Sequence, residues 1–317
     1  MKTRNHNRAA ESKGNTHEEG AQGLSNPQGV KTDIHQAITD QILAAMETAR
    51  ATGRRLWDSQ PSLPMNLATG KPYSGVNVLI LWAAGLNHGY ASPYWLTYKQ
   101  ATERGGQVRK GEHGTRCVFY KPWEQQETNK DTGETETVKG AVIKTFTAFN
   151  LDQIDGIQAP AKEERPAFQS IEDAERIMAA SPAPIKIGGT QACYIPGRDE
   201  IHLPPREAFI NAEAFYSTAM HEMTHSTGHK SRLDRDFSGR FGTEAYAFEE
   251  LIAEMGSAFL NADLGILTAT LPDHADYLAN WIAILKNDKK AILTAAAQAS
   301  KAHGFIKGLI AAQAVAA

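Results

Sequence analysis

Hydrophobic and polar positions follow two different periods along the chain, and these periods outline its elements. Between residues 34 and 46 apolar side chains recur every three or four positions, which predicts an amphipathic helix. Residues 115–121 (TRCVFYK) and 141–150 (AVIKTFTAFN) are rich in β-branched and aromatic side chains, and a charged tip with Asp131 and Gly133 separates them. This arrangement predicts a long β-hairpin. Residues 76–85 (VNVLILWAAG) are apolar throughout, which fits a buried helix or a buried strand equally well.

The second half of the chain has a mainly helical pattern. Residues 156–169 contain two prolines and a charge cluster without any period, so we expect a linker there. Ser170 and Asp173 resemble a capping box that opens a helix, and two short strand patterns follow, IKI and YIPGRDEIHLP. The second of these fits an edge strand that pairs with an extended substrate, or ordinary sheet. Alanine-rich amphipathic helices fill the region from Asp276 onward.

These patterns predict an α+β fold with two domains. The first covers residues 31–155 and the second, mostly helical, covers residues 170–310. Residues 1–30 have almost nothing to bury, so we expect a disordered tail.

Composition narrows the class of protein further. The chain has 317 residues, a net charge of −3 and only two cysteines, Cys117 and Cys193, which lie far apart. These values argue against a disulfide scaffold, a cysteine zinc site and nucleic-acid binding through overall charge. Because no stretch resembles a signal peptide or a membrane span, we expect a soluble cytoplasmic protein without a membrane partner.

The motif that carries the most chemistry is His221-Glu222-Met223-Thr224-His225, an H-E-x-x-H sequence. Asn211 is a suitable N-cap and Gly228 a suitable terminator for a helix across this motif. Two imidazoles one helical turn apart bind a tetrahedral Zn²⁺, while Glu222 reaches the water beside the metal as a general base. Mn²⁺ and other divalent ions also suit such a site. The alternative is a solvated helix face that carries two histidines by chance.

A third ligand is expected from the next helix, which Thr243 caps and which offers Glu249, Glu250 and Glu254. Residues 250–254 (ELIAE) resemble the E-x-x-[SA]-[DE] element of the thermolysin-like gluzincins. That resemblance implies Glu250 as the zinc ligand and Glu254 as the carboxylate that orients a ligand histidine, although Glu249 remains an alternative ligand. Tyr246, one turn before Glu250, either steadies an oxyanion or packs. The three glutamates also fit the solvated back of an amphipathic helix.

The segment from Trp95 to Trp123 has six basic residues against two acidic ones, with aromatic residues between them. Cations that follow a phosphate backbone and rings that stack on bases are what a single-stranded DNA-binding surface requires. Basic loops and aromatic side chains are also common in proteins that bind no DNA. The DNA-binding candidates are Trp95, Tyr98, Lys99, Arg104, Arg109, Lys110, Arg116, Tyr120 and Lys121.

Taken together, several segments resemble the ArdC-type antirestriction proteins of conjugative plasmids over roughly residues 32–310. The carriers are SGVNVLILW, TYKQATERGGQVRKGEHGT, YKPW, HEMTHSTGHKSRLDRD, YAFEELIAEMG and YLANWIAILKNDKK. The resemblance implies an α+β single-stranded DNA-binding domain followed by a zincin-like metallopeptidase domain of the gluzincin type, with an unidentified protein substrate. It also implies protection of plasmid DNA from restriction during conjugation.

Two alternatives remain open. In one, the protein binds DNA and its metal site is structural or vestigial, although a structural site does not need a general base such as Glu222. In the other, the protein is a regulatory metallopeptidase whose amino-terminal domain binds protein.

Overall fold

A computed structural model describes residues 33–51, 62–128, 135–160, 167–237, 243–266 and 274–316. The tail predicted at residues 1–30 and the charged tip of the hairpin lie outside these ranges. The chain from Ile34 onward forms one compact unit. The fold is α+β, with an amino-terminal sheet region followed by a helical region, as predicted.

The amino-terminal region is built around a five-stranded sheet in the order β2-β1-β3-β6-β5. Its strands are β1 (Met65–Asn66), β2 (Lys71–Pro72), β3 (Tyr94–Leu96), β5 (Thr115–Thr128) and β6 (Thr135–Asn150). The helices of this region are α1 (Ile34–Ala51), α2 (Val76–His88) and α3 (Tyr98–Glu103). A separate two-stranded ladder joins β4 (Gln107–Val108) to β7 (Ile154–Asp155).

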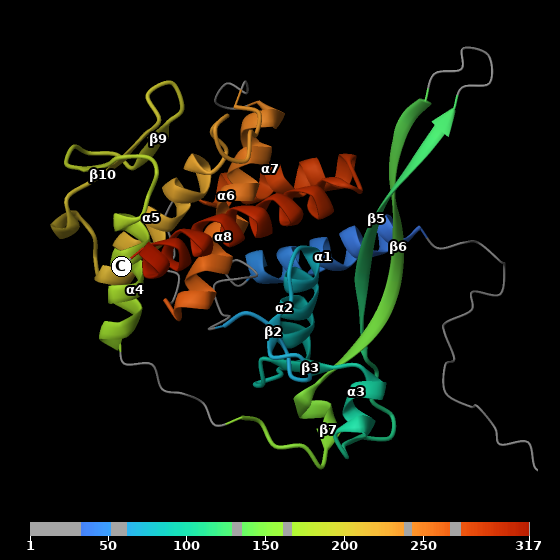
Figure 1. The fold of residues 1–317 in the computed structure, drawn as a ribbon. Helices are drawn as coiled ribbons and strands as arrows, with labels where there is room; N and C mark the ends of the chain where they lie inside the picture. The colour runs from blue at the N-terminus through green and yellow to red at the C-terminus, as the bar shows by residue number, and fades with distance from the viewer. Residues whose placement is uncertain are drawn as a thin grey trace, which may run out of the picture. The chain divides into compact units, whose positions relative to one another are not determined.

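Strands β5 and β6 form the predicted hairpin, which Figure 1 shows as a long twisted ribbon. The antiparallel register runs from Thr115 opposite Ala148 to Thr128 opposite Thr135. Near its base Cys117, Val118 and Ala148 are buried, because α2 packs on this part of the sheet. Immediately beyond, consecutive residues on opposite faces are exposed, Phe119 at 54% and Tyr120 at 63%.

The apolar segment that fitted either a helix or a strand forms helix α2. Eight of its residues are buried, from Val76 to Ala84, on nearly every side of the helix. A helix that is apolar all round is stable where other elements cover it, and α1, β5 and the last helix of the chain all contact α2. The hydrophobic pattern alone did not distinguish a helix from a strand here, because the segment is buried on nearly every side.

The carboxy-terminal region combines helices with a small three-stranded sheet in the order β8-β10-β9. Its elements are α4 (Ala167–Ala179), β8 (Ile185–Ile187), β9 (Cys193–Ile195), β10 (Glu200–Leu203), α5 (Ala212–Ser226), α6 (Glu244–Leu264), α7 (His274–Asn287) and α8 (Ala291–Ala316). The prediction that Ser170 caps the first helix was wrong, since α4 already begins at Ala167.

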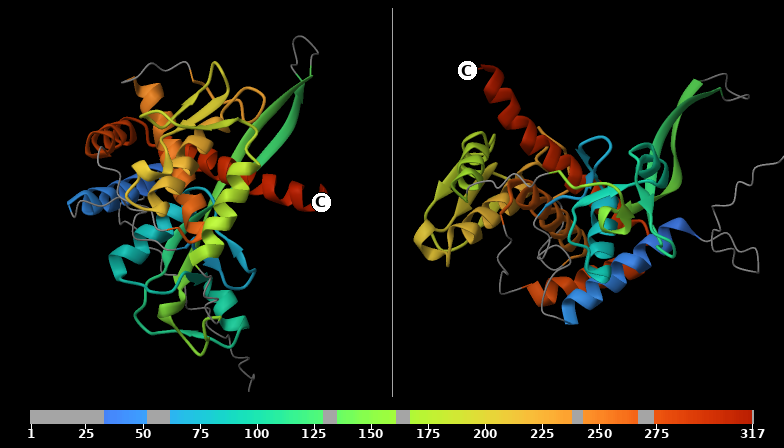
Figure 2. Two further views of the ribbon diagram at one scale, coloured as in Figure 1. Left: turned by 90° about the vertical axis from the view of Figure 1, so that its left-hand side faces the viewer. Right: turned by 90° about the horizontal axis from the view of Figure 1, so that it is seen from below.

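One hydrophobic cluster connects the two regions. It contains residues of α1 and α2 together with residues of α6, α7 and α8. The Oγ1 of Thr39 donates a hydrogen bond to the carbonyl of Lys289 at 2.9 Å, and the backbone N–H of Gly75 donates to Ser300 Oγ at 2.7 Å. Figure 2 shows α1 beside the carboxy-terminal helices in both views. A second cluster lies within the carboxy-terminal region, on α4, α5, the small sheet and the ends of α6 and α8.

Of the helices in the described ranges, none combines the length and apolar character that a membrane span requires.

Candidate metal centre

The candidate site lies where α5 and α6 pack against each other. Both predicted N-caps are confirmed: Asn211 Oδ1 accepts from the N–H of Ala214 at 2.8 Å, and Thr243 Oγ1 accepts from the N–H of Tyr246 at 3.3 Å. These caps satisfy backbone donors that the first helical turn leaves unpaired, so the sequence itself determines where each helix begins. The helix that carries His221 and His225 therefore starts at a defined position.

Gly228 follows the end of α5, as predicted for a terminator, but close packing is what requires a glycine there. A Cβ at this position would lie 2.5 Å from the ring of Phe237 and 2.9 Å from Nη2 of Arg235. A side chain at this position would therefore require the Phe237 ring and the Arg235 guanidinium to move. The glycine thus lets the segment from His229 to Phe237 fold back over the end of α5.

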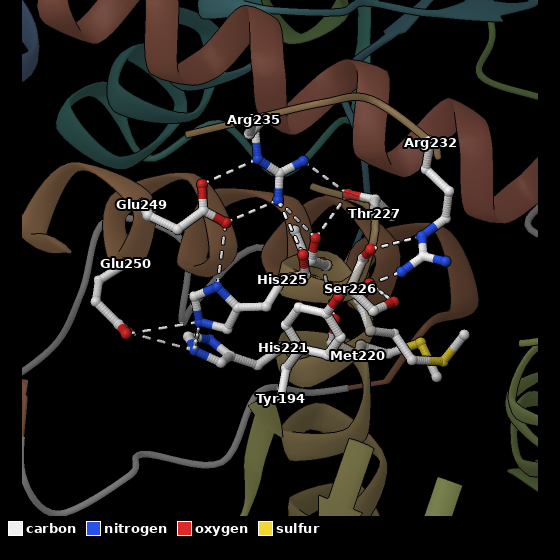
Figure 3. A network of polar contacts seen from close by, with 12 residues as sticks. Tyr194, Met220, His221, His225, Ser226, Thr227, Arg232, Arg235, Glu249 and Glu250 are labelled. Atoms are coloured by element: carbon white, nitrogen blue, oxygen red, sulfur yellow. Dashed lines mark hydrogen bonds and ion pairs between the residues drawn. The ribbon is translucent and has the colours of Figure 1, made fainter. Parts of the chain in front are cut away.

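Three side chains converge between the two helices, and Figure 3 shows them pointing toward one another. The Nε2 atoms of His221 and His225 lie 3.1 Å apart. Oε2 of Glu250 lies 3.4 Å from Nε2 of His221, and Oε1 of Glu250 lies 3.6 Å from Nε2 of His225. One donor atom from each residue falls within 4.8 Å of the others. Two imidazoles and one carboxylate form a donor set that suits Zn²⁺ or Mn²⁺, so the residues fit a divalent metal.

Glu249, the alternative ligand, points its carboxylate to the other side of the His225 ring. Its Oε1 lies 3.1 Å from Nδ1 of His225. A charged carboxylate only accepts hydrogen bonds, so Nδ1 donates to Glu249, while Nε2 faces Glu250. Glu254, with its Oε1 3.8 Å from Nδ1 of His221, lies in the corresponding place beside the other histidine.

The electrostatics of this cluster are dominated by its carboxylates. Burial disfavours the charged form of His225, but hydrogen bonds with Glu249 and Glu250 outweigh burial and raise its pKa to about 10. Burial similarly opposes ionisation of Glu250, yet its hydrogen bonds with His221 and His225 hold its pKa well below the usual range. The carboxylates of the cluster therefore favour positive charge at the place where the two histidines and Glu250 meet.

Glu222, which follows the ligand candidate His221 in α5, is 7% exposed. Its charge is among the causes that raise the pKa of His221. Burial first, and then the charge of Glu222, also raise the pKa of the Cys193 thiol on β9. Strand β9 is an edge of the described three-stranded sheet, whereas β10, directly before the site helix, is its centre. Helix α5, which carries Glu222, contacts both β9 and β10.

Tyr246 and His229 lie outside the group of three. Tyr246 is half-buried in the first turn of α6, and its proposed role at an oxyanion stays a prediction. His229 follows the end of α5, where its Nδ1 lies 2.8 Å from Ser231 Oγ. Sequence reasoning gave no role to Arg235, which contacts Glu249; the repeated arginines of SRLDRD were the available signal.

The aromatic candidates for DNA binding fall into two environments. Trp95 is 2% exposed and packs edge-on against Tyr90, so the prediction that it stacks on a base was wrong. It lies in the core because β3 is an inner strand of the five-stranded sheet. Exposed rings are those of Tyr98 and Tyr120.

The basic candidates also differ from one another. Lys110 and Arg116 are exposed, whereas Lys99 is exposed but lies 3.6 Å from Glu103. Arg104 donates to the carbonyl of Ala68 at 3.2 Å. Arg109 is bound by the carboxylates of Glu112 and Asp155, at 3.0 and 3.3 Å. The side chain of Lys121 lies outside the described part of the structure.

Residues 172–298, which contain the site, match the family described as zincin-like metallopeptidase. Residues 32–149 match the family described as the N-terminal domain of anti-restriction factor ArdC. The chain therefore belongs to the ArdC-type antirestriction proteins, in agreement with the resemblance found in its sequence.

Individual relatives agree with this assignment. A crystal structure of the antirestriction ArdC protein from plasmid R388, free of metal, has a TM-score of 0.72 and 38% identity, covering 88% of this chain and 98% of that one. The Mn(II)-bound structure of the R388 protein has a TM-score of 0.71 and 37% identity, with the same coverage. An uncharacterized protein, y4eC of Sinorhizobium fredii, is 41% identical over 276 residues, covering 85% of this chain and 90% of its own length. DNA primase TraC of Escherichia coli is 39% identical over 294 residues, covering 87% of this chain but only 27% of TraC.

Proposed function

We propose that this protein binds single-stranded DNA that enters the cell during plasmid conjugation, and that it carries a zinc- or manganese-dependent peptidase in the same chain. The observation that carries the peptidase half is the convergence of His221, His225 and Glu250, with Glu222 beside them. A structural metal site does not need a buried general base next to its ligands, so Glu222 favours a catalytic site.

The residues divide the chemistry of peptide hydrolysis among themselves. The metal, when bound by His221, His225 and Glu250, supplies a Lewis acid and lowers the pKa of water at the site. The Glu222 carboxylate accepts a proton from the attacking water and then passes it to the departing amine. Burial between α5 and α6 keeps bulk water from competing for that proton.

The proposed substrate is an extended segment of a host protein. Strand β9 supports this proposal because it forms an edge of its sheet and lies near Glu222. An extended peptide added to this edge would gain backbone hydrogen bonds while its scissile bond lay beside the carboxylate.

For the DNA half of the proposal, the support comes from family membership and from exposed side chains in the amino-terminal region. The rings of Tyr98 and Tyr120 are exposed, as are the charges of Lys110 and Arg116. Exposed rings stack on unpaired bases, and a duplex does not offer its bases in this way, so we expect a preference for single strands. We place this function in the cytoplasm, where incoming plasmid DNA meets restriction enzymes.

One variant tests the connection between the two halves. Glu222→Gln removes the proton acceptor but leaves the three ligands, so it should bind metal and single-stranded DNA normally while losing cleavage. Antirestriction is then measured as the survival of an unmodified plasmid after conjugation into a restricting host. If the variant protects as well as the wild type, occupation of DNA and not peptide cleavage provides the protection.

A further inference from the structure

The segment after α5 contains a buried arginine that no step of the proposed chemistry uses. Arg235 has a side chain only 4% exposed, and its guanidinium faces the carboxylate of Glu249 in Figure 3. Its Nε donates to Glu249 Oε2 at 2.9 Å and its Nη2 donates to Glu249 Oε1 at 2.7 Å. This two-pronged contact matches the planar guanidinium to the carboxylate and holds both oxygens of Glu249 in place.

The remaining donors of Arg235 attach it to the end of α5. Nη1 donates to Thr227 Oγ1 at 2.7 Å, and Nη2 also donates to the carbonyl of Thr224 at 2.8 Å. The backbone N–H of Arg235 donates to the carbonyl of Gly228 at 2.9 Å. The preceding Asp234 adopts a left-handed conformation with φ of 49°, which turns the chain back toward the helix. Arg235 is therefore held on one side by α5 and on the other by Glu249 of α6.

The contacts continue from Arg235 to the metal ligands. Glu249 Oε1 receives a hydrogen bond from Arg235 and lies 3.1 Å from Nδ1 of His225. The Nε2 atom of the same ring faces His221 and Glu250. Fixing Glu249 thus fixes both the orientation of the His225 ring and the nitrogen that carries its proton.

We infer that Arg235 is a positioning residue for the metal centre, acting through Glu249 to present Nε2 of His225 to the ion. The inference rests on the proposed metal site. Arg235 also supplies a positive charge among Glu249, Glu250, Glu254 and Glu222, all of which are buried or half-buried. Without that charge, Glu249 would be a buried carboxylate with His225 as its remaining charged partner at the site, and its geometry would no longer be determined.

The same segment provides a matched control. Arg232 is also buried, at 6% exposed, and also contacts a carboxylate through two nitrogens, that of Asp199. Its Nε donates to the carbonyl of Ser226 at 2.7 Å, so it too attaches the segment to the end of α5. Neither Asp199 nor Arg232 contacts a residue of the ligand cluster. Loss of Arg232 should therefore disturb the segment without disturbing the metal.

The test measures the affinity of the full-length chain for Zn²⁺ by competition with a chromophoric chelator at constant pH. We compare the wild type with Arg235→Met, Arg235→Lys, Glu249→Gln, the double variant Arg235→Met/Glu249→Gln, and the control Arg232→Met. Arg235→Met should weaken Zn²⁺ binding by about tenfold to a hundredfold, the usual cost of removing an outer partner of a metal ligand. Arg235→Lys keeps the positive charge but cannot make two parallel hydrogen bonds with Glu249, so its loss of Zn²⁺ affinity should be smaller. Arg232→Met should bind as the wild type does.

The double variant separates positioning from general destabilisation. If Arg235 acts through Glu249, adding Arg235→Met to Glu249→Gln should weaken Zn²⁺ binding little further. Equal losses in Arg235→Met and Arg232→Met, an unchanged affinity in Arg235→Met, or additive losses in the double variant would each overturn the inference. If Arg235→Met does not fold, Arg235→Lys is compared with Arg235→Lys/Glu249→Gln instead. The inference then requires that Arg235→Lys weakens Zn²⁺ binding in the wild type but adds little to Glu249→Gln. A wild type that binds no Zn²⁺ or Mn²⁺ would instead overturn the proposed metal site itself.

Discussion

The metal centre and the basic segment of the amino-terminal region represent two different ways of placing functional side chains. His225 is 9% exposed, and both of its ring nitrogens have a neighbour within 3.1 Å. Tyr120 on the hairpin is 63% exposed, and its nearest cross-strand neighbour is Ile143. In the buried site the side chains hold one another in place through these contacts, so a single substitution affects the whole cluster. On the hairpin the side chains act separately, so each substitution should have a small and nearly additive effect.

The largest effect is expected at Glu222. Glu222→Gln should lower the rate of peptide cleavage by about a hundredfold to ten-thousandfold, the range that general acid–base groups contribute. Its metal content should not change. A peptide library is first screened with the wild type to identify a peptide that it cleaves, and mass spectrometry then measures the cleavage rate of that peptide. Elemental analysis measures the metal content. Cleavage at the wild-type rate would remove Glu222 from the mechanism.

The next prediction compares Trp95 and Tyr120, two aromatic residues of one segment, by their effects on stability and on DNA affinity. Trp95→Ala should destabilise the fold by about 3–5 kcal/mol, because it empties part of the core. Tyr120→Ala should leave stability unchanged but lower affinity for single-stranded DNA by about 1–3 kcal/mol, the usual contribution of a stacked ring. Thermal unfolding and fluorescence anisotropy measure the two quantities. The comparison fails if Tyr120→Ala unfolds the protein or leaves DNA affinity unchanged.

A third effect distinguishes the neighbouring glutamates of α6. Glu250→Gln removes an atom of the ligand cluster, so it should lower Zn²⁺ affinity by more than the about tenfold to hundredfold expected for Glu249→Gln, which only orients His225. Chelator competition on both variants, with Glu244→Gln at the exposed start of α6 as a control, gives the order. A greater loss in the Glu249 variant would exchange the roles of the two residues.

The smallest effect concerns charge on the amino-terminal surface. Arg116→Gln should make the slope of log affinity against log salt shallower by about 0.7, since one phosphate contact on a single strand is lost. Arg109→Gln should change that slope less, because Glu112 and Asp155 already neutralise Arg109. Anisotropy titrations over a series of salt concentrations measure both slopes. Equal changes in the two variants would show that ion pairing does not remove Arg109 from the DNA surface.

Part of the fold and of the site could be predicted from local sequence alone. The caps Asn211 and Thr243 and the shared face of His221 and His225 all depend on residues a few positions apart. An α-helix brings positions i and i+4 to one face wherever it lies, so the motif implied its geometry before any packing was known. The extent of α2 was harder, because a helix buried on all sides has no polar face to reveal its period.

Other features depended on which surfaces meet. The rotation of α6 against α5 brings Glu250, and not Glu249, to the Nε2 atoms of the histidines, although both residues have the same side chain. Trp95 and Tyr98 belong to one aromatic and basic segment, yet Trp95 lies on the inner strand β3 and is buried, whereas Tyr98 begins helix α3 and is exposed. Composition does not specify which side of a strand is covered.

The sequence by itself determined where the helices of the site begin, which pair of histidines share a face and which family the chain belongs to, because these follow from local hydrogen bonding and from order along the chain. Only the tertiary structure decided that Arg235, in the segment after α5, reaches Glu249 on α6, fourteen residues away in sequence. That contact needs Gly228 to bring the segment close, the left-handed turn at Asp234, and α6 packed at one angle against α5. Such contacts arise from the relative placement of elements, which no local pattern encodes.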